Sequence, residues 1–466
     1  MAFIGFRCNN LISSTILKRL SCKPLYRTVT SKQFYTPDPD KPAPWPYKER
    51  GYRWWHQYID GTTKRLDENS RLIVVEGNIG SGKGKFSREL AEMLGFHYIP
   101  AVNLDDIFVD SYGVDRRHFY HLLPESCRFF DAKLFYENPR HKNVANFQYM
   151  MFYSKVENYL NSLAHLMNTG QGVVTERIAH SDFVFVKAMH EQGFLSDDCT
   201  KWSVCFVALF LLLVRSVILV YDYYFKLRKH ILATIPLFPH LVIYLDCPVR
   251  KCMENINRRN IPWENNGKVI DFSYLETIEN GYKEYLKQAD DESVIMVYDW
   301  ENSGEVALVV EDIEKVDLDT YEWHKNNKFE GWHNIASEVW WCYRRWQYTS
   351  KVSIMRHFCT MPCWDVPEML IHPDDHGLLT WVAENVITGK YSSGYNTEKG
   401  DSFWKIFFSS NIHNVANASW YDHFFRDGWY YHNRRMYAPV VYLPNIPEEE
   451  LKPREFIMRD NKVLSS

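Results

Sequence analysis

The stretch RLIVVEGNIGSGKGKFSREL, residues 71–90, decides the fold. Its apolar run LIVVEG ends in glycine, as a buried parallel strand does, and KFSRELAEML then carries apolar residues at helical spacing. Between the two, Gly77, Gly80, Gly82 and Lys83 match the phosphate-binding loop pattern G-x-x-x-x-G-K-[ST]. The last position of that pattern, which normally carries a hydroxyl, is Gly84. The sequence therefore predicts a phosphate-binding loop that lacks one metal-ordering group.

This loop predicts a site for the phosphates of a nucleotide. Its glycines let successive backbone N–H groups point inward, and the helix that follows adds the positive end of its dipole. The lysine is expected to reach the outer phosphates. The candidate nucleotide-binding residues of the loop are Gly77, Asn78, Ile79, Gly80, Ser81, Gly82, Lys83 and Gly84.

Further apolar runs extend the alternation of strand and helix. They are HYIPAV (97–102), GVVTER (172–177), HLVIYLDCP (240–248) and SVIMVYD (293–299), with helical segments between them. Five short apolar strands separated by helices predict an α/β fold with a doubly wound, parallel, five-stranded sheet. Ligands of such sheets bind at the carboxyl ends of the strands.

Composition narrows the classes of function. The chain has 466 residues, of which 46% are hydrophobic, and a formal net charge of −4, which gives no electrostatic case for a nucleic-acid partner. Its ten cysteines show no C-x-x-C spacing, so we predict no metal site. The aromatic content of 16% favours a subunit with extensive protein contacts.

The N-terminal region is basic and then rich in proline. Residues 1–36 contain Lys and Arg but no Asp or Glu, and LISSTILKRL can form a short basic amphipathic helix. We interpret this region as a mitochondrial transit peptide, with a disordered basic tail as the alternative. Residues 37–70 read as a Pro-rich arm or linker, so the folded core is expected to begin near Arg71. The predicted location is the mitochondrial matrix.

Two segments together resemble the deoxyribonucleoside kinase family: VEGNIGSGK and VVTERIAHSDFVFVKAM. That family closes its third strand with Glu-Arg-Ser, which stands here as Glu176, Arg177 and Ile178. The resemblance implies that Glu176 and Arg177 orient a nucleotide. A structural ion pair at the strand end is the alternative for these two residues.

The same resemblance assigns roles to residues on two other segments. FQYMMFYSK is similar to the family helix whose glutamine pairs with the base, which gives Gln148 that role. CPVRKCMENINRRN is similar to the lid whose arginines clamp the phosphates, with Arg258 and Arg259 as the candidates.

Other segments resemble a branch of this family that is not a kinase. GKGK, TGQGVVTER and above all GKYSSGYNTEKGD (389–401) are similar to the alpha-subcomplex 10 accessory subunits of mitochondrial NADH:ubiquinone oxidoreductase, respiratory complex I. The resemblance implies other complex I subunits as partners, and a place on the matrix side of the inner membrane through that complex. It also implies FAD as a cofactor; the loop by itself indicates only a bound (deoxy)nucleotide of unspecified identity.

Phosphoryl transfer needs Mg²⁺ at the phosphates and a base for the attacking hydroxyl. Gly84 offers the metal no hydroxyl, and Ala101 stands where the kinases of this family have a glutamate base. We therefore predict no catalytic residue and a non-catalytic accessory subunit on a degenerate kinase scaffold. The alternative is an active mitochondrial deoxyribonucleoside kinase that uses Asp105 or Asp106 as its base.

Two regions fall outside the kinase-like domain, which we place at 71–320. TKWSVCFVALFLLLVRSVILV (200–220) is an apolar insertion, to be explained as a membrane helix, an interface insertion or a wrongly included coding stretch, of which we favour the last. Residues 321–466 form an aromatic-rich C-terminal extension that we interpret as an interface segment.

Overall fold

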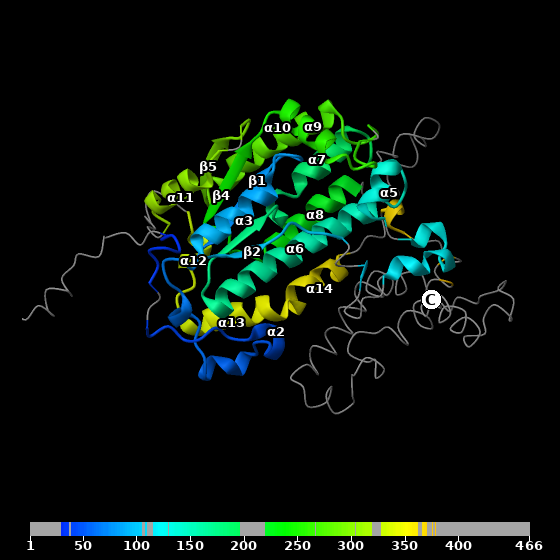
Figure 1. Cartoon of the computed structure of the whole chain (residues 1–466). Helices are drawn as coiled ribbons and strands as arrows, with labels where there is room; N and C mark the ends of the chain where they lie inside the picture. Colours follow the sequence, from blue (N-terminus) through cyan, green and yellow to red (C-terminus); the bar gives the residue numbers. More distant parts are fainter. Residues whose placement is uncertain are drawn as a thin grey trace, which may run out of the picture.

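The computed structural model describes most of the N-terminal three quarters of the chain (Figure 1). The described residues are 29–36, 39–104, 108–109, 115–128, 130–195, 220–265, 267–302, 304–318, 328–361, 366–370, 375 and 378. The GKYSSGYNTEKGD stretch, Asp105 and Asp106 lie outside them, as do residues 200–219 of the apolar insertion. Within the described residues no helix is both long and apolar enough to cross a membrane.

A single parallel sheet of five strands organises the described residues, in the order β2-β3-β1-β4-β5. The strands are β1 (Leu72–Gly77), β2 (His97–Ile99), β3 (Val173–Glu176), β4 (Leu241–Asp246) and β5 (Val294–Asp299). All six residues of β1 are buried, as its continuous apolar run predicts for a central strand. The edge strand β5 is only partly buried. The predicted doubly wound five-stranded sheet is confirmed.

Helices cover both faces of the sheet. Those before the β3 crossover are α2 (Tyr47–Arg50), η1 (Trp54–Tyr58), η2 (Thr63–Arg65), α3 (Lys83–Leu94), η3 (Arg116–Leu122), η4 (Glu125–Cys127), α5 (Ala132–Glu137) and α6 (Val144–Thr169). Those after it are η5 (Ala179–Ser181), α7 (Phe183–Glu191), α8 (Val220–Leu232), α9 (Val249–Arg259), α10 (Phe272–Ala289), α11 (Val306–Lys315), α12 (Glu330–His333), α13 (Glu338–Ser350), α14 (Val352–Thr360) and η7 (Pro367–Met369).

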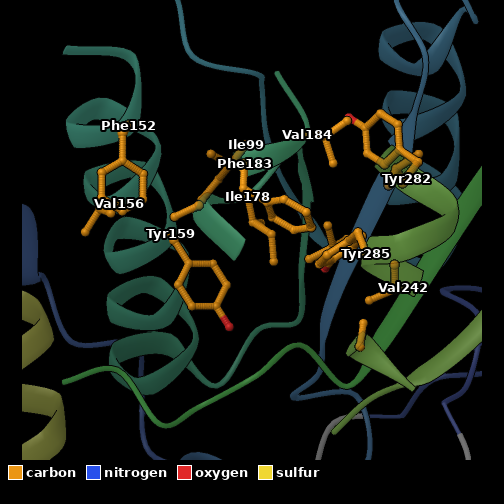
Figure 2. Packing of buried hydrophobic residues seen from close by; sticks show 14 of the residues in the cluster. Ile99, Phe152, Val156, Tyr159, Ile178, Phe183, Val184, Val242, Tyr282 and Tyr285 are labelled. Atoms are coloured by element: carbon orange, nitrogen blue, oxygen red, sulfur yellow. The ribbon is translucent and has the colours of Figure 1, made fainter. Parts of the chain in front are cut away.

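The core lies between the sheet and the helices α6, α7 and α10. Figure 2 shows side chains from these helices gathered over the sheet, among them Tyr159, Phe183 and Tyr285, all at most 3% exposed. On α6, 20 of the 26 residues are buried, so this helix is central to the domain. Burial on this scale fixes the carboxyl ends of the strands relative to the helices that follow them.

The prediction that folded structure begins near Arg71 is wrong. Val29 and Tyr52 are at most 2% exposed, and Ser31 N–H donates to the Glu314 carboxylate at 2.7 Å. At the end of α6, Gly170 has φ +70°, and an added Cβ there would lie 1.9 Å from the carbonyl oxygen of Arg65. The segment from residue 29 therefore packs onto the domain as an arm. The absence of a side chain at Gly170, at the C-terminal end of α6, leaves space for the backbone of this arm.

The domain boundary predicted at residue 320 is also too early. Helices α13 and α14 lie along α6, and the N-terminal arm lies beside α13 (Figure 1). Arg345 of α13 is 0% exposed; it donates to Asp60 of the arm at 2.8 Å and to Asn168 of α6 at 2.8 Å, and it covers the Tyr52 ring at 3.8 Å. One face of α13 thus belongs to the core of the domain, which the aromatic composition of this region did not indicate.

Replacing Arg345 should loosen the arm and the domain together. In Arg345→Ala, Asp60 keeps its bond to Arg65 but loses its buried partner on α13. We expect the free energy of unfolding to fall by about 3–5 kcal/mol in urea denaturation, because a buried ion pair loses one partner. Lys64→Ala, an exposed lysine on the same arm, is the control and should cost less than about 0.5 kcal/mol. Equal stability of the two variants would contradict this account of the arm.

Candidate functional site

A cavity of about 1280 Å³ opens at the carboxyl ends of the strands. It collects most of the residues predicted from sequence, although these lie on four different segments. Those that line it are Ile79, Gly80, Ser81, Gly82, Lys83, Gly84, Gln148, Glu176, Arg177, Arg258 and Arg259. Gly77 and Asn78 are not in its wall; Asn78 is 1% exposed and donates to the Leu275 carbonyl of α10 at 2.9 Å. Asn78 thus connects the loop to α10, and Gly77 lies close to the Leu245 carbonyl of β4.

The glycine loop is clamped against α9. Gly80 has φ +82°, and an added Cβ would lie 2.7 Å from the carbonyl oxygen of Cys252. Asn255 of the same helix donates to the Gly80 carbonyl at 2.9 Å. A residue without a Cβ is therefore required at this point, and the loop is preformed by the helix that carries Arg258 and Arg259.

Lys83 is folded back onto its own loop. Its ammonium donates to the Asn78 carbonyl at 2.6 Å and to Ser81 Oγ at 3.1 Å. Burial, and then the nearby charge of Arg177, lower the pKa of Lys83 well below its usual value. An anion in the cavity would relieve both effects, since it favours the charged form of the lysine.

Glu176 faces the loop from the end of β3. A Cβ added at Gly84 would lie 3.6 Å from Oε1 and 3.9 Å from Oε2 of Glu176. The Glu176 carboxylate accepts a hydrogen bond of 2.5 Å from the Tyr98 hydroxyl, which β2 supplies from the neighbouring strand position. Position 84 and Glu176 are thus adjacent, and a phenol already occupies one carboxylate oxygen.

Arg177, the next residue, has a strained backbone conformation that the surrounding structure must hold in place. Its φ of +49° lies in the left-handed region, which is costly for a residue with a side chain. Its guanidinium lies 5.1 Å from the centre of the Phe185 ring, and its Nε is buried without a hydrogen-bond partner among the described residues. Among the described residues no salt bridge joins Arg177 to Glu176, whose Oε1 accepts a hydrogen bond from Tyr98, so the two interpretations of this pair both remain predictions.

Gln148 is held by a buried carboxylate. Its amide nitrogen donates to Asp182 at 2.9 Å, and the same carboxylate accepts from Lys155 at 2.6 Å and from Tyr224 at 2.7 Å. All four side chains are at most 5% exposed. The glutamine is therefore fixed in orientation, with its amide oxygen left to accept a hydrogen bond from a ligand.

The charge of the cavity wall is strongly positive. Nine lysine and arginine side chains line it against four carboxylates. Arg259 lies 3.7 Å from Glu264, one of the four, while Arg258 beside it also faces the cavity. Aromatic residues such as Tyr136 and Trp300 complete the wall. A basic and partly aromatic cavity of this size is suited to a ligand with several phosphates and a planar ring.

Ala101 lies in the wall of the cavity, where the sequence comparison expected a carboxylate base. Of the residues that could replace it, Asp105 and Asp106 lie outside the described residues. The described wall thus offers a phosphate cradle and a fixed glutamine, without a base at position 101 or a hydroxyl at position 84.

Comparison with known proteins agrees with this geometry. The deoxynucleoside kinase family model matches residues 73–337, more than half of the chain. The chain belongs to the deoxynucleoside kinase family. The match ends at the start of α13, so the helix that carries Arg345 follows the part that is common to the family.

The similar proteins are named as subunits of an NADH dehydrogenase and as a deoxynucleoside kinase. The chain is 30% identical to NADH dehydrogenase [ubiquinone] 1 alpha subcomplex subunit 10, mitochondrial, of Rattus norvegicus, over 74% of this chain and 86% of the relative. The Bos taurus protein of the same name is 29% identical over 74% of this chain and 90% of its own. A deoxyguanosine kinase of Dictyostelium discoideum is 26% identical over 54% of this chain and 72% of the enzyme.

Several residues that shape this kinase-family site were missed in the sequence. Asp182 follows Glu176 by six residues on the same connection, so an acid near a strand end was a visible signal. Lys155 lies seven residues after Gln148, which places both on one face of α6. Tyr98 gave no signal, because its contact with Glu176 depends on the pairing of β2 with β3.

The two loop glycines provide a matched test of the loop geometry. Gly80→Ala should lower the free energy of unfolding by about 1–3 kcal/mol, since the new Cβ meets the Cys252 carbonyl in a left-handed conformation. Gly84→Ala should be neutral or stabilising by up to about 1 kcal/mol, because it lies inside α3 and meets nothing closer than 3.6 Å. Urea denaturation of both variants checks this, and a more stable Gly80→Ala would contradict the clamped loop.

Proposed function

We propose that this chain is a non-catalytic accessory subunit of mitochondrial respiratory complex I. In this proposal the kinase-like domain is a scaffold that supports the assembly and stability of the NADH-to-ubiquinone complex. The main support for this proposal is the wall of the cavity, in which the phosphate-binding loop is preformed. In that wall Ala101 and Gly84 occupy the positions of the base and of the metal-ordering hydroxyl. Loss of a general base alone costs about 10²–10⁴-fold in rate.

The relatives support the same proposal. The similarity to the alpha subcomplex subunit 10 proteins spans 74% of the chain, whereas that to the deoxyguanosine kinase spans 54%. The chain covers 86% of the rat subunit, so the comparison concerns nearly the whole of that protein. Because these relatives are named as mitochondrial, we place this chain in mitochondria, and more specifically on the matrix side of the inner membrane through complex I.

The proposed presequence must end earlier than residue 36. Residues 29–36 pack on the domain: Thr30 N–H donates to Asn69 at 2.8 Å and Lys32 N–H to the Met93 carbonyl at 2.9 Å. Removal of these residues would delete the buried Val29 and expose the core side chains against which it packs. The basic segment that import would remove is therefore confined, in this proposal, to residues before Val29.

The proposed ligand of the cavity is a phosphate-bearing nucleotide. The excess of lysine and arginine fits the phosphates of a (deoxy)nucleotide as well as the pyrophosphate of FAD, and the volume of about 1280 Å³ admits either. The fixed oxygen of Gln148 fits the donor edge of a base or ring. Visible absorbance of the purified protein, with mass spectrometry of the molecule released by denaturation, distinguishes a flavin from a mononucleotide.

Exposed aromatic side chains mark the proposed contact surface with other subunits. They lie on the arm and on the outer face of α13, which Glu338 joins by accepting hydrogen bonds from Thr62 and Thr63. Two aliphatic side chains lie beside the aromatic ones in the sequence. We name the whole set the aromatic surface; it consists of the aromatic Trp54, Trp55, Tyr58, Trp340 and Tyr343 and the aliphatic Ile59 and Val339, each at least 38% exposed. Trp and Tyr are the residues most often found at the energetic centre of protein interfaces.

The proposed subunit should migrate with complex I. In blue-native electrophoresis of detergent-solubilised mitochondria, an antibody against this chain should detect it in the complex I band. Trp340→Ser, on the aromatic surface, should lower the bound fraction, because such an anchor contributes about 2 kcal/mol or more. Leu308→Ser, an equally exposed apolar residue on α11, is the control. Migration only as a free small species would refute the proposed function.

The purified chain should also fail as a kinase. Incubated with MgATP and each of the four deoxynucleosides, it should yield no monophosphate, because position 101 carries no carboxylate and position 84 no hydroxyl. Binding of ATP to the same preparation, followed by calorimetry, shows that the protein is folded and competent. Turnover near ~10 s⁻¹, the usual value for an enzyme, would favour the alternative of an active deoxyribonucleoside kinase.

A further inference from the structure

Kinase chemistry in this family implies Mg²⁺ beside the phosphates, and the residues present can be tested for it. Mg²⁺ demands near-octahedral oxygen ligands and is held by one or two carboxylates or hydroxyls together with the phosphates. Neither Gly84 nor Ala101 has a side-chain oxygen that could ligate the metal. Of the cavity's carboxylates, Glu176 is the one adjacent to position 84, with its oxygens 3.6 and 3.9 Å from a Cβ built there.

Glu176 is already engaged by a different donor. The Tyr98 hydroxyl donates to its Oε1 at 2.5 Å, and the Arg88 guanidinium lies over the Tyr98 ring at 5.7 Å. Burial, and then the neighbouring Glu176, raise the pKa of Tyr98, so the phenol stays protonated and remains a donor. A carboxylate that accepts this short bond would have to give it up before it could ligate a cation.

Fixed cations take over the role of neutralising phosphate charge. Lys83, Arg177 and Arg258 face the cavity together with six other basic side chains. The Nε of Arg177 is buried without a hydrogen-bond partner among the described residues, and burial, followed by the charge of Arg177, lowers the pKa of Lys83. Phosphate oxygens are the acceptors that complete such a set.

We propose that this site, if it serves the nucleotide-binding role proposed above, binds its nucleotide without a divalent cation, and that Tyr98 is the positioning residue that holds Glu176 out of metal coordination. The geometry differs from a kinase site at two points that act together. One is the missing hydroxyl at Gly84, and the other is the Tyr98 bond to the carboxylate beside it.

The test is the affinity of the full-length purified chain for ATP, measured by calorimetry in EDTA and in excess MgCl₂. The dissociation constant in EDTA should be equal to or lower than that in magnesium. The double variant Gly84→Ser with Tyr98→Phe provides the hydroxyl and releases the carboxylate, so magnesium should now tighten its binding by about tenfold or more. Gly84→Ala with Tyr98→Phe, which lacks the hydroxyl, is the matched control and should stay insensitive to magnesium.

The outcomes separate this inference from the proposed function. Binding by the natural chain that requires magnesium would overturn the inference and leave the nucleotide site standing. A double variant that folds, by thermal denaturation, yet gains no magnesium dependence would overturn the role of Tyr98. Absence of ATP binding in both buffers, repeated with GTP and dATP, would overturn the nucleotide site itself and the inference with it. If the variants do not fold, the comparison of the two buffers with the natural chain still decides the question.

Discussion

The pairing of β1 with both β3 and β4 is the constraint on which the site depends. Val75 lies opposite Glu176 on one side, and Gly77 lies opposite Leu245 on the other. This register brings the loop after β1, the acid at the end of β3 and the helix after β4 to one edge of the sheet. Because β1 is fully buried, a slip of one residue would exchange the side chains that pack against the helices on the two faces, so close packing fixes the register.

Sequence patterns predicted the parts of the fold whose cause is local. Continuous apolar runs gave all five strands, and the glycine loop placed the helix that begins at Lys83. The packing of the arm and α13 into the core of the domain was not predicted, because their contacts are not local. Arg345 contacts Asp60 across 285 positions of the chain, and no periodicity in either segment indicates a buried guanidinium. Composition indicated an arm or linker for the first segment and an interface for the second, and both also have buried faces.

The same distinction applies within the site. The glycines and Lys83 are recognisable because one short segment carries the whole phosphate cradle. The groups that decide the chemistry are supplied by separate strands: Ala101 follows β2, and Glu176 ends β3 beside Tyr98 of β2. The alanine at position 101, where the resemblance leads us to expect a carboxylate, was visible in the sequence. Occupation of Glu176 by a phenol was not, since it depends on which strands are neighbours in the sheet.

The electrostatics of Lys83 give a physical reason to keep the phosphate cradle in the non-catalytic subunit proposed above. Lys83 is buried beside the charge of Arg177, and both conditions disfavour its charged form. The strained backbone at Arg177 adds to this cost. A bound polyphosphate offsets these terms in the folded state alone, and a ligand present at one hundred times its dissociation constant stabilises a fold by about 2.7 kcal/mol. That amount is a substantial part of the stability of an ordinary domain. A preformed loop beside an alanine at position 101 is therefore what is expected if, as proposed, the nucleotide is a structural component of the subunit.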